Sequence, residues 1–150
     1  MREILFRGKR VDNGEWLESI SIINVVGEFG CMWHMAQRSN NYNMRALLDR
    51  HKNITEISNC YLYRVIPETI GQFTGFYDKH DRKIFEGDIC LCHRNINKSI
   101  DKKVFQICYD KVRGFWGLSN DDFTIDPCEF DLCEIIGNIH DNLEIWEGKS

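Results

Sequence analysis

The chain has 150 residues, a formal net charge of −4, 43% hydrophobic residues and 12% aromatic residues. This composition excludes a disordered chain, because a disordered chain buries too little apolar surface to offset the entropy lost on folding. No apolar run is long enough to cross a bilayer, and the start of the sequence lacks the features of a signal peptide. We therefore expect a cytoplasmic protein without membrane contact.

The first half of the sequence predicts β structure followed by a short helix. Residues 4–11 and 16–26 have the composition of strands, and Asn13-Gly14 between them is a strong hairpin signal. No period is clear over residues 27–43. Residues 44–51 combine helix formers with apolar spacings of three and four, so we expect one short helix there, with Asn43 as its N-cap.

The second half predicts a series of short strands separated by Gly, Asp and Asn turns. The expected strands are residues 60–66, 69–77, 83–85, 88–93, 104–109, 115–118 and 132–139. This spacing is typical of a small barrel or sandwich of antiparallel strands, and the pattern of the C-terminal half resembles that of an SH3-like barrel. We expect one domain over residues 1–150, with a division into 1–66 and 67–150 as the alternative.

Polar turn formers interrupt the β-prone runs between residues 74 and 90. We predict a hairpin over residues 74–85 with its turn within 78–82, and a sharp corner at Gly87 with positive φ. Asp78, Asp81 and Asp88 are then structural turn residues. Together with Glu86, these carboxylates could instead hold a divalent cation or act as an acid and base, but we favour the turn interpretation.

The seven cysteines, in a chain without an export signal, favour free thiols over a disulfide framework. Cys90 and Cys92 share one face of a predicted strand, and Cys128 with Cys133 could complete a four-sulfur zinc site. We favour thiols packed in the core, with no metal and no cofactor. No nucleophile or phosphate-loop motif is present, so we assign no catalytic residue.

Two basic clusters could contact phosphates. One lies near the start and consists of Arg2, Arg7, Lys9 and Arg10. The other lies in an expected hairpin loop over residues 94–103 and consists of Arg94, Lys98, Lys102 and Lys103. Charged hairpin tips more often keep a loop solvated. Nucleic-acid contact by the second cluster is therefore the alternative hypothesis and not the one we favour.

Three segments resemble one family. They are residues 65–75 continuing to 84–89, the start 1–10 with 14–16, and Ile-Ile-Gly-Asn-Ile-His-Asp-Asn at 135–142. Together they resemble the YopX family of phage and prophage proteins. The family usually has Gly in the turn at 79–81 and Pro where this chain has Leu143, and residues 25–59 and 94–103 show no resemblance. The resemblance implies a phage context and no assigned molecular function.

We therefore expect a non-enzymatic phage or prophage accessory protein that acts as a macromolecular interaction module, through a protein partner or self-association. The alternative is a nucleic-acid-binding module that uses residues 94–103. A thiol- or metal-dependent enzyme is the third hypothesis.

Overall fold

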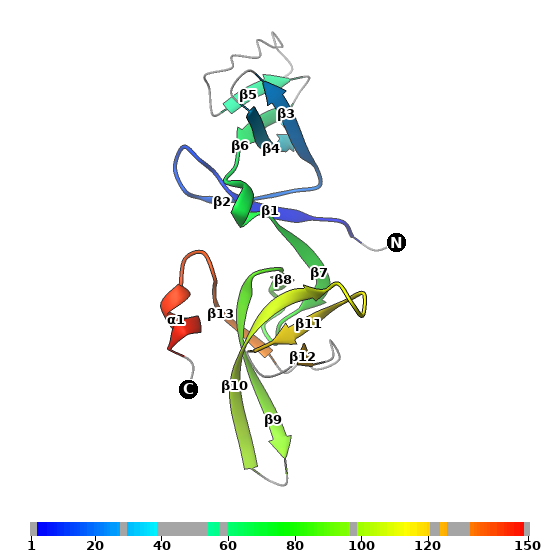
Figure 1. Ribbon diagram of the computed structural model, residues 1–150, viewed down its shortest axis with the longest axis vertical. Helices are drawn as coiled ribbons and strands as arrows, with labels where there is room; N and C mark the ends of the chain where they lie inside the picture. The colour runs from blue at the N-terminus through cyan, green and yellow to red at the C-terminus, as the bar shows by residue number, and fades with distance from the viewer. Residues whose placement is uncertain are drawn as a thin grey trace. The chain divides into compact units, whose positions relative to one another are not determined.

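The computed structural model describes residues 3–27, 30–38, 54–57, 60–96, 99–120, 124–125 and 133–148. Most of these residues form antiparallel β-strands, which confirms the predicted mainly β fold. They cluster into two compact units, one from Glu3 to Gln72 and one that begins at Phe73. The boundary lies inside strand β7 (Gly71–Tyr77), whereas the alternative division considered from the sequence lies after residue 66. We call them the N-terminal unit and the C-terminal unit (Figure 1).

The N-terminal unit contains a hairpin and a four-stranded sheet. The predicted hairpin joins β1 (Phe6–Lys9) to β2 (Trp16–Ser19), and Gly14 in its turn has φ +73°. The sheet has the order β3-β4-β6-β5 and consists of β3 (Ile22–Gly27), β4 (Gly30–Arg38), β6 (Cys60–Arg64) and β5 (Ile54–Ile57). Leu17, Met35 and Val65 form the buried core of this unit. A short 3-10 helix, η1 (Pro67–Thr69), follows β6.

The run 16–26, predicted as one strand, is two strands, because the chain bends at Ile20 and Ser21. The Ser19 hydroxyl accepts a hydrogen bond from Ser21 N (3.1 Å) and donates one to the Ala36 carbonyl. Local serine bonds of this kind compete with the strand ladder. The bend lets β2 pair with β1 and β3 pair with β4.

The C-terminal unit begins with the predicted hairpin, formed by β7 and β8 (Lys83–Phe85). Its turn lies at residues 78–82, where Asp78 N donates to the Arg82 carbonyl at 2.9 Å, so that prediction is confirmed. A five-stranded sheet follows with the order β12-β11-β10-β9-β13. Its strands are β9 (Asp88–Ile96), β10 (Ser99–Asp110), β11 (Phe115–Ser119), β12 (Thr124–Ile125) and β13 (Cys133–Asn138).

A buried cluster with Ile84, Phe105, Ile107 and Leu118 forms the core of the C-terminal unit. Successive side chains of a strand point to opposite faces of the sheet, so one face of β9, β10 and β11 contributes to this core. The described α-helix, α1 (Leu143–Glu147), follows β13 and was not predicted. The helix predicted over residues 44–51 lies outside the described residues. Among the described residues, no helix is long and apolar enough to span a membrane.

Candidate functional site

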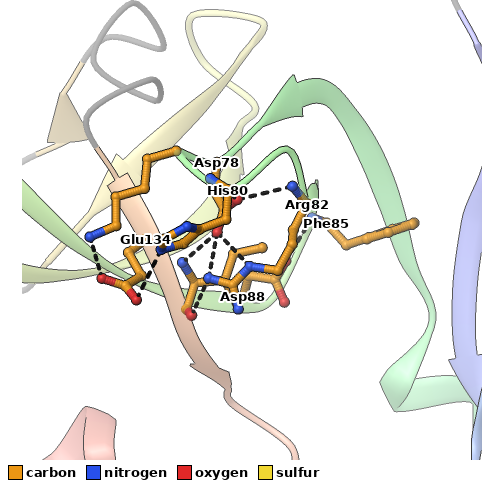
Figure 2. Close-up of polar contacts among 8 residues, drawn as sticks. Asp78, His80, Arg82, Phe85, Asp88 and Glu134 are labelled. Atoms are coloured by element: carbon orange, nitrogen blue, oxygen red, sulfur yellow. Dashed lines mark hydrogen bonds and ion pairs between the residues drawn. The ribbon is translucent and has the colours of Figure 1, made fainter.

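The Asp78 carboxylate is the centre of a buried hydrogen-bond network. Oδ1 accepts from His80 N (2.9 Å) and Arg82 N (3.0 Å), whereas Oδ2 accepts from Arg82 Nε (2.8 Å) and from Ile135 N in β13 (3.1 Å). Figure 2 shows Arg82 directed toward Asp78. Burial alone would raise the pKa of Asp78, but the hydrogen bonds from Arg82, Ile135 and His80 lower this pKa to about 2. Asp78 therefore has a structural role, because its hydrogen bonds stabilise the turn and connect the turn to β13.

Glu134, also on β13, forms ion pairs with the same turn. Its Oε2 lies 2.6 Å from Lys79 Nζ and its Oε1 lies 3.4 Å from His80 Nε2 (Figure 2). The hydrogen bond from Lys79 lowers the pKa of Glu134. These side chains are partly exposed, and their ion pairs add a second link between the turn and β13.

Gly87 and Asp88 form the corner that precedes β9. Gly87 has φ +84°, as the sequence predicts, and its backbone donates to the Ile107 carbonyl and accepts from Ile139 N, both at 2.9 Å. The buried Asp88 accepts a hydrogen bond from Phe85 N at Oδ2 (2.8 Å; Figure 2). Asp81 is an exposed turn residue with φ 60°. In the described part of the chain no group of His, Cys, Asp or Glu side chains is arranged to hold a metal ion.

The cysteines differ from the expectation of free thiols. Cys92 and Cys133 form a disulfide, with their Cα atoms 4.1 Å apart. They are direct partners because β13 pairs antiparallel with β9, although 41 residues separate them in sequence. A disulfide supplies no thiolate, so these two sulfurs are not available for the four-sulfur alternative. Cys90 keeps its thiol and is buried in the core, and Cys128 lies outside the described residues.

The described residues of the basic segment 94–103 belong to strands, contrary to the expectation of a loop. Residues 94–96 belong to β9 and residues 99–103 belong to β10, in a register that places Arg94 opposite Asp101. Continued backbone pairing of β9 with β10 extends the hairpin through the described part of this polar segment. Lys102 and Lys103 are exposed on β10, and Lys98 lies outside the described residues. The structure therefore places Lys102 and Lys103 on one strand of the β9–β10 hairpin (Figure 1).

Three basic residues near the start of the chain, Arg7, Lys9 and Arg10, have partners within the chain. Arg10 Nε lies 2.9 Å from Asp12 Oδ1, and this hydrogen bond raises the pKa of Arg10. The Arg7 guanidinium lies 4.7 Å from the Trp16 ring centroid, and Lys9 Nζ lies 5.8 Å from it. The cations that the sequence analysis had considered for phosphate binding therefore already make contacts within the chain. Arg2 lies outside the described residues.

The C-terminal unit contains an aromatic groove with a volume of about 440 Å³. Its lining residues are Thr74, Gly75, Phe76, Tyr109, Gly114, Phe115 and Trp116. The rings of Tyr109 and Trp116 meet edge to face, with their centroids 5.0 Å apart. This arrangement is favourable for aromatic pairs and fixes both rings. None of the described lining residues is charged.

Two local structures shape this groove. β7 bulges between Phe73 and Tyr77, where Gly75 has φ +90°, and Thr74 Oγ1 supports the bulge by donating to the Ile84 carbonyl (2.8 Å). The turn between β10 and β11 ends at Gly114, which has φ +77°. Asp110 Oδ1 closes that turn by accepting from the backbone N–H groups of residues 112 and 113. The groove therefore lies between a bulge and a tight turn.

The sequence analysis did not find the groove. Its local signals were present, because residues 69–77 and 115–118 were both predicted as strands. No pattern in the sequence showed that residues 74–76 line the same cavity as residues 114–116.

A model of the YopX family, described as YopX protein, matches residues 6–147. The chain belongs to the YopX family. A crystal structure of protein EF1440 from Enterococcus faecalis is similar to this YopX-family chain, with 21% sequence identity and a TM-score of 0.54. The similarity covers 97% of this chain and 99% of that one. At this identity the likeness shows the fold alone. No match was found among curated proteins.

The segments that carried the YopX resemblance include a corner and a connection between secondary-structure elements. Residues 84–89 contain the Gly87 corner, and residues 135–142 run from β13 to the N-cap of α1. In the first of these segments the Asp88 carboxylate accepts from Phe85 N, and in the second Ile135 N donates to Asp78. The aromatic groove is consequently the candidate binding site of this YopX-family chain.

Proposed function

We propose that this chain is a non-enzymatic accessory protein of a phage or prophage that binds another macromolecule in the host cytoplasm through the aromatic groove. The observation that carries the proposal is the groove itself, which is lined by four aromatic side chains. Its volume lies within the range of roughly 300–1,000 Å³ that is common for ligand sites. Aromatic residues are also enriched at binding interfaces, where each covers a large contact area.

The electrostatics of the C-terminal unit support binding rather than catalysis. The Asp78 carboxylate, whose pKa is lowered to about 2, is held in a structural turn. Burial raises the pKa of the free Cys108 thiol, which leaves less of the reactive thiolate at neutral pH. Neither group has the properties of an acid, a base or a nucleophile that acts on a substrate.

Capture of partners from phage-infected or induced host cells, followed by mass spectrometry, tests this proposal. The bait proteins are the wild type, Tyr109→Ala and a matched control, Tyr77→Ala. Tyr109 and Tyr77 are 43% and 42% exposed, and each ring packs edge to face on one aromatic neighbour. Only Tyr109 lines the groove. We expect Tyr109→Ala to lose a partner that both other proteins retain, whereas identical capture by all three would refute the proposal.

Nucleic-acid binding by the β9–β10 hairpin is the second candidate. The exposure of Lys102 and Lys103 on adjacent positions of β10 favours it. If these lysines contact phosphates, affinity for DNA or RNA falls steeply with salt, and the Lys102→Ala and Lys103→Ala double variant has a smaller salt slope. Equal slopes for the wild type and the double variant would exclude this role.

A further inference from the structure

The C-terminal segment, residues 133–148, is attached to the rest of the C-terminal unit with little apolar burial. It consists of β13, the turn after it and α1. Of its residues, all of which the structure describes, only Cys133 is buried. Ile135 packs against the core cluster but is only partly buried. The hydrophobic effect therefore holds this segment in place mainly at Cys133.

β13 is also an edge strand. In the sheet order β12-β11-β10-β9-β13 it comes last, so its described neighbour is β9. The register of this pair shifts between Ile135 and Gly137. An irregularity of this kind interrupts the ladder of backbone hydrogen bonds. The pairing of β13 with the sheet is consequently one-sided and incomplete.

Polar contacts connect the start of β13 to the 78–82 turn. Lys79 N donates to the Cys133 carbonyl at 3.0 Å, and Arg82 Nη2 donates to the Ile135 carbonyl at 2.9 Å. The ion pairs of Glu134 with this turn are partly exposed. Water can replace hydrogen bonds and exposed ion pairs at a small net cost in free energy. These contacts alone are therefore a weak attachment for the segment.

The disulfide adds the covalent part of the attachment. It joins Cys133, the buried residue of the C-terminal segment, to Cys92 in β9, across 41 residues of sequence. While the S–S bond is intact, β13 cannot move away from β9 at this position, even when its hydrogen bonds open. Once the bond is broken, a partly exposed edge strand with replaceable polar contacts remains.

From these observations we infer that the Cys92–Cys133 disulfide is a redox switch, and that its reduction by a dithiol lets β13 and α1 detach from the edge of β9. The S–S bond of the protein breaks and two cysteine thiols form. The dithiol supplies the two electrons and the two protons and is itself oxidised to a disulfide. The inference takes from the proposed function only the cytoplasmic setting, in which disulfides are usually transient.

Burial of the two sulfurs makes the switch slow unless β13 opens. Cys92 and Cys133 are 3% and 0% exposed, and a thiolate can attack only a sulfur that it can reach. Opening of β13 therefore precedes reduction, and reduction then makes further opening easier. Detachment of β13 uncovers the N–H and C=O groups along the edge of β9, so the switch controls whether the sheet has an open edge.

Hydrogen exchange of the oxidised protein and of the protein reduced with a small dithiol tests the inference. The readout is the protection of the β13 amides relative to those of β11, a strand of the same sheet that the disulfide does not join. We expect reduction to lower this relative protection about tenfold or more, because β13 then opens locally. Reoxidation should restore it. A global loss of stability accelerates exchange in both strands equally and leaves the ratio unchanged.

Cysteine variants show whether the effect belongs to this disulfide. The double variant with Cys92→Ala and Cys133→Ala should have a weakly protected β13 both with and without the dithiol. Cys108→Ala, at a free cysteine of β10, should respond to the dithiol as the wild type does. Thermal unfolding of each variant confirms that it is folded.

The rate of reduction under native conditions tests whether opening of β13 gives the dithiol access. Glu134→Ala removes the ion pairs with Lys79 and His80, so β13 should open more often and reduction should be a few-fold faster. Glu147→Ala removes the same charge from an exposed position of α1. This control should be reduced at the rate of the wild type.

Three results would overturn the inference. They are an unchanged ratio of protection between β13 and β11 after reduction, equal reduction rates for Glu134→Ala and the wild type, and a thiol count that shows no disulfide in the oxidised protein. None of these measurements involves the aromatic groove. Failure of the redox switch therefore leaves the proposed function standing, and failure of the capture experiment leaves the switch standing.

Discussion

Gly137 and Asn142 are packed so closely that any side chain at position 137 would force Asn142 to move. A Cβ built on Gly137 would lie 2.7 Å from Asn142 Oδ1 and 3.0 Å from Asn142 Cβ. The same Oδ1 accepts a hydrogen bond from Asn138 N at 3.3 Å. The contact connects the end of β13 to the N-cap of α1.

Gly137→Ala should therefore lower the free energy of unfolding by about 1–3 kcal/mol, because the added methyl group overpacks the contact. Chemical denaturation measures this loss. In an Asn142→Ala background the amide group is gone, so the same substitution should cost less. Equal costs in the two backgrounds would show that the contact with Asn142 is not the cause.

Gly87→Val should destabilise the protein by roughly 1–3 kcal/mol, because φ +84° is unfavourable for a β-branched residue. The Cβ itself has room, since it would lie 3.4 Å from Ile139 Cγ1, an ordinary contact distance. Asp88→Asn should cost much less, because the amide oxygen can still accept from Phe85 N. Thermal unfolding of both variants checks this, and a Gly87→Val protein as stable as the wild type would contradict the corner conformation.

Stability should decrease in acid through Asp78. The pKa of Asp78 in the folded protein is about 2, below its ordinary value of 3.8, so the folded state binds the proton less readily than the unfolded state. The contribution of Asp78 to the free energy of unfolding is therefore complete above about pH 5. It amounts to about 2 kcal/mol and is lost as the pH falls toward 2. Urea denaturation between pH 6 and pH 2 measures it. Asp78→Asn should lack this part of the pH dependence, and parallel curves for the two proteins would argue against the lowered pKa.

The Cys92–Cys133 disulfide should be detectable by thiol counting. Denatured without reductant, the protein should show two fewer reactive thiols than after reduction, and peptide mapping should link residues 92 and 133. Replacement of both cysteines by alanine should lower the free energy of unfolding by about 2–4 kcal/mol, because the unfolded chain is no longer cross-linked. Cys108→Ala, at a free cysteine, is the control and should leave the difference of two thiols unchanged. Reaction of all seven thiols without reductant would exclude the disulfide.

The corner and hairpin turn were predictable because their signals are local. Asp78 binds N–H groups of residues 80 and 82, and Gly87 is a corner residue that adopts positive φ. Such preferences act within a few residues of the chain. The break at Ser21 is also local, but the prediction missed it because the apolar run continues on both sides of it.

The sequence by itself determined a mainly β chain, the 78–82 turn, the Gly87 corner and a resemblance to the YopX family. The tertiary structure decided which distant strands pair and in which register. Pairing of β13 with β9 places Cys133 opposite Cys92 and Ile135 N beside Asp78, and the fold of the C-terminal unit brings residues 74–76 to the same groove as residues 114–116. These relationships depend on which apolar faces are buried together, and composition and periodicity describe each strand without naming its neighbour.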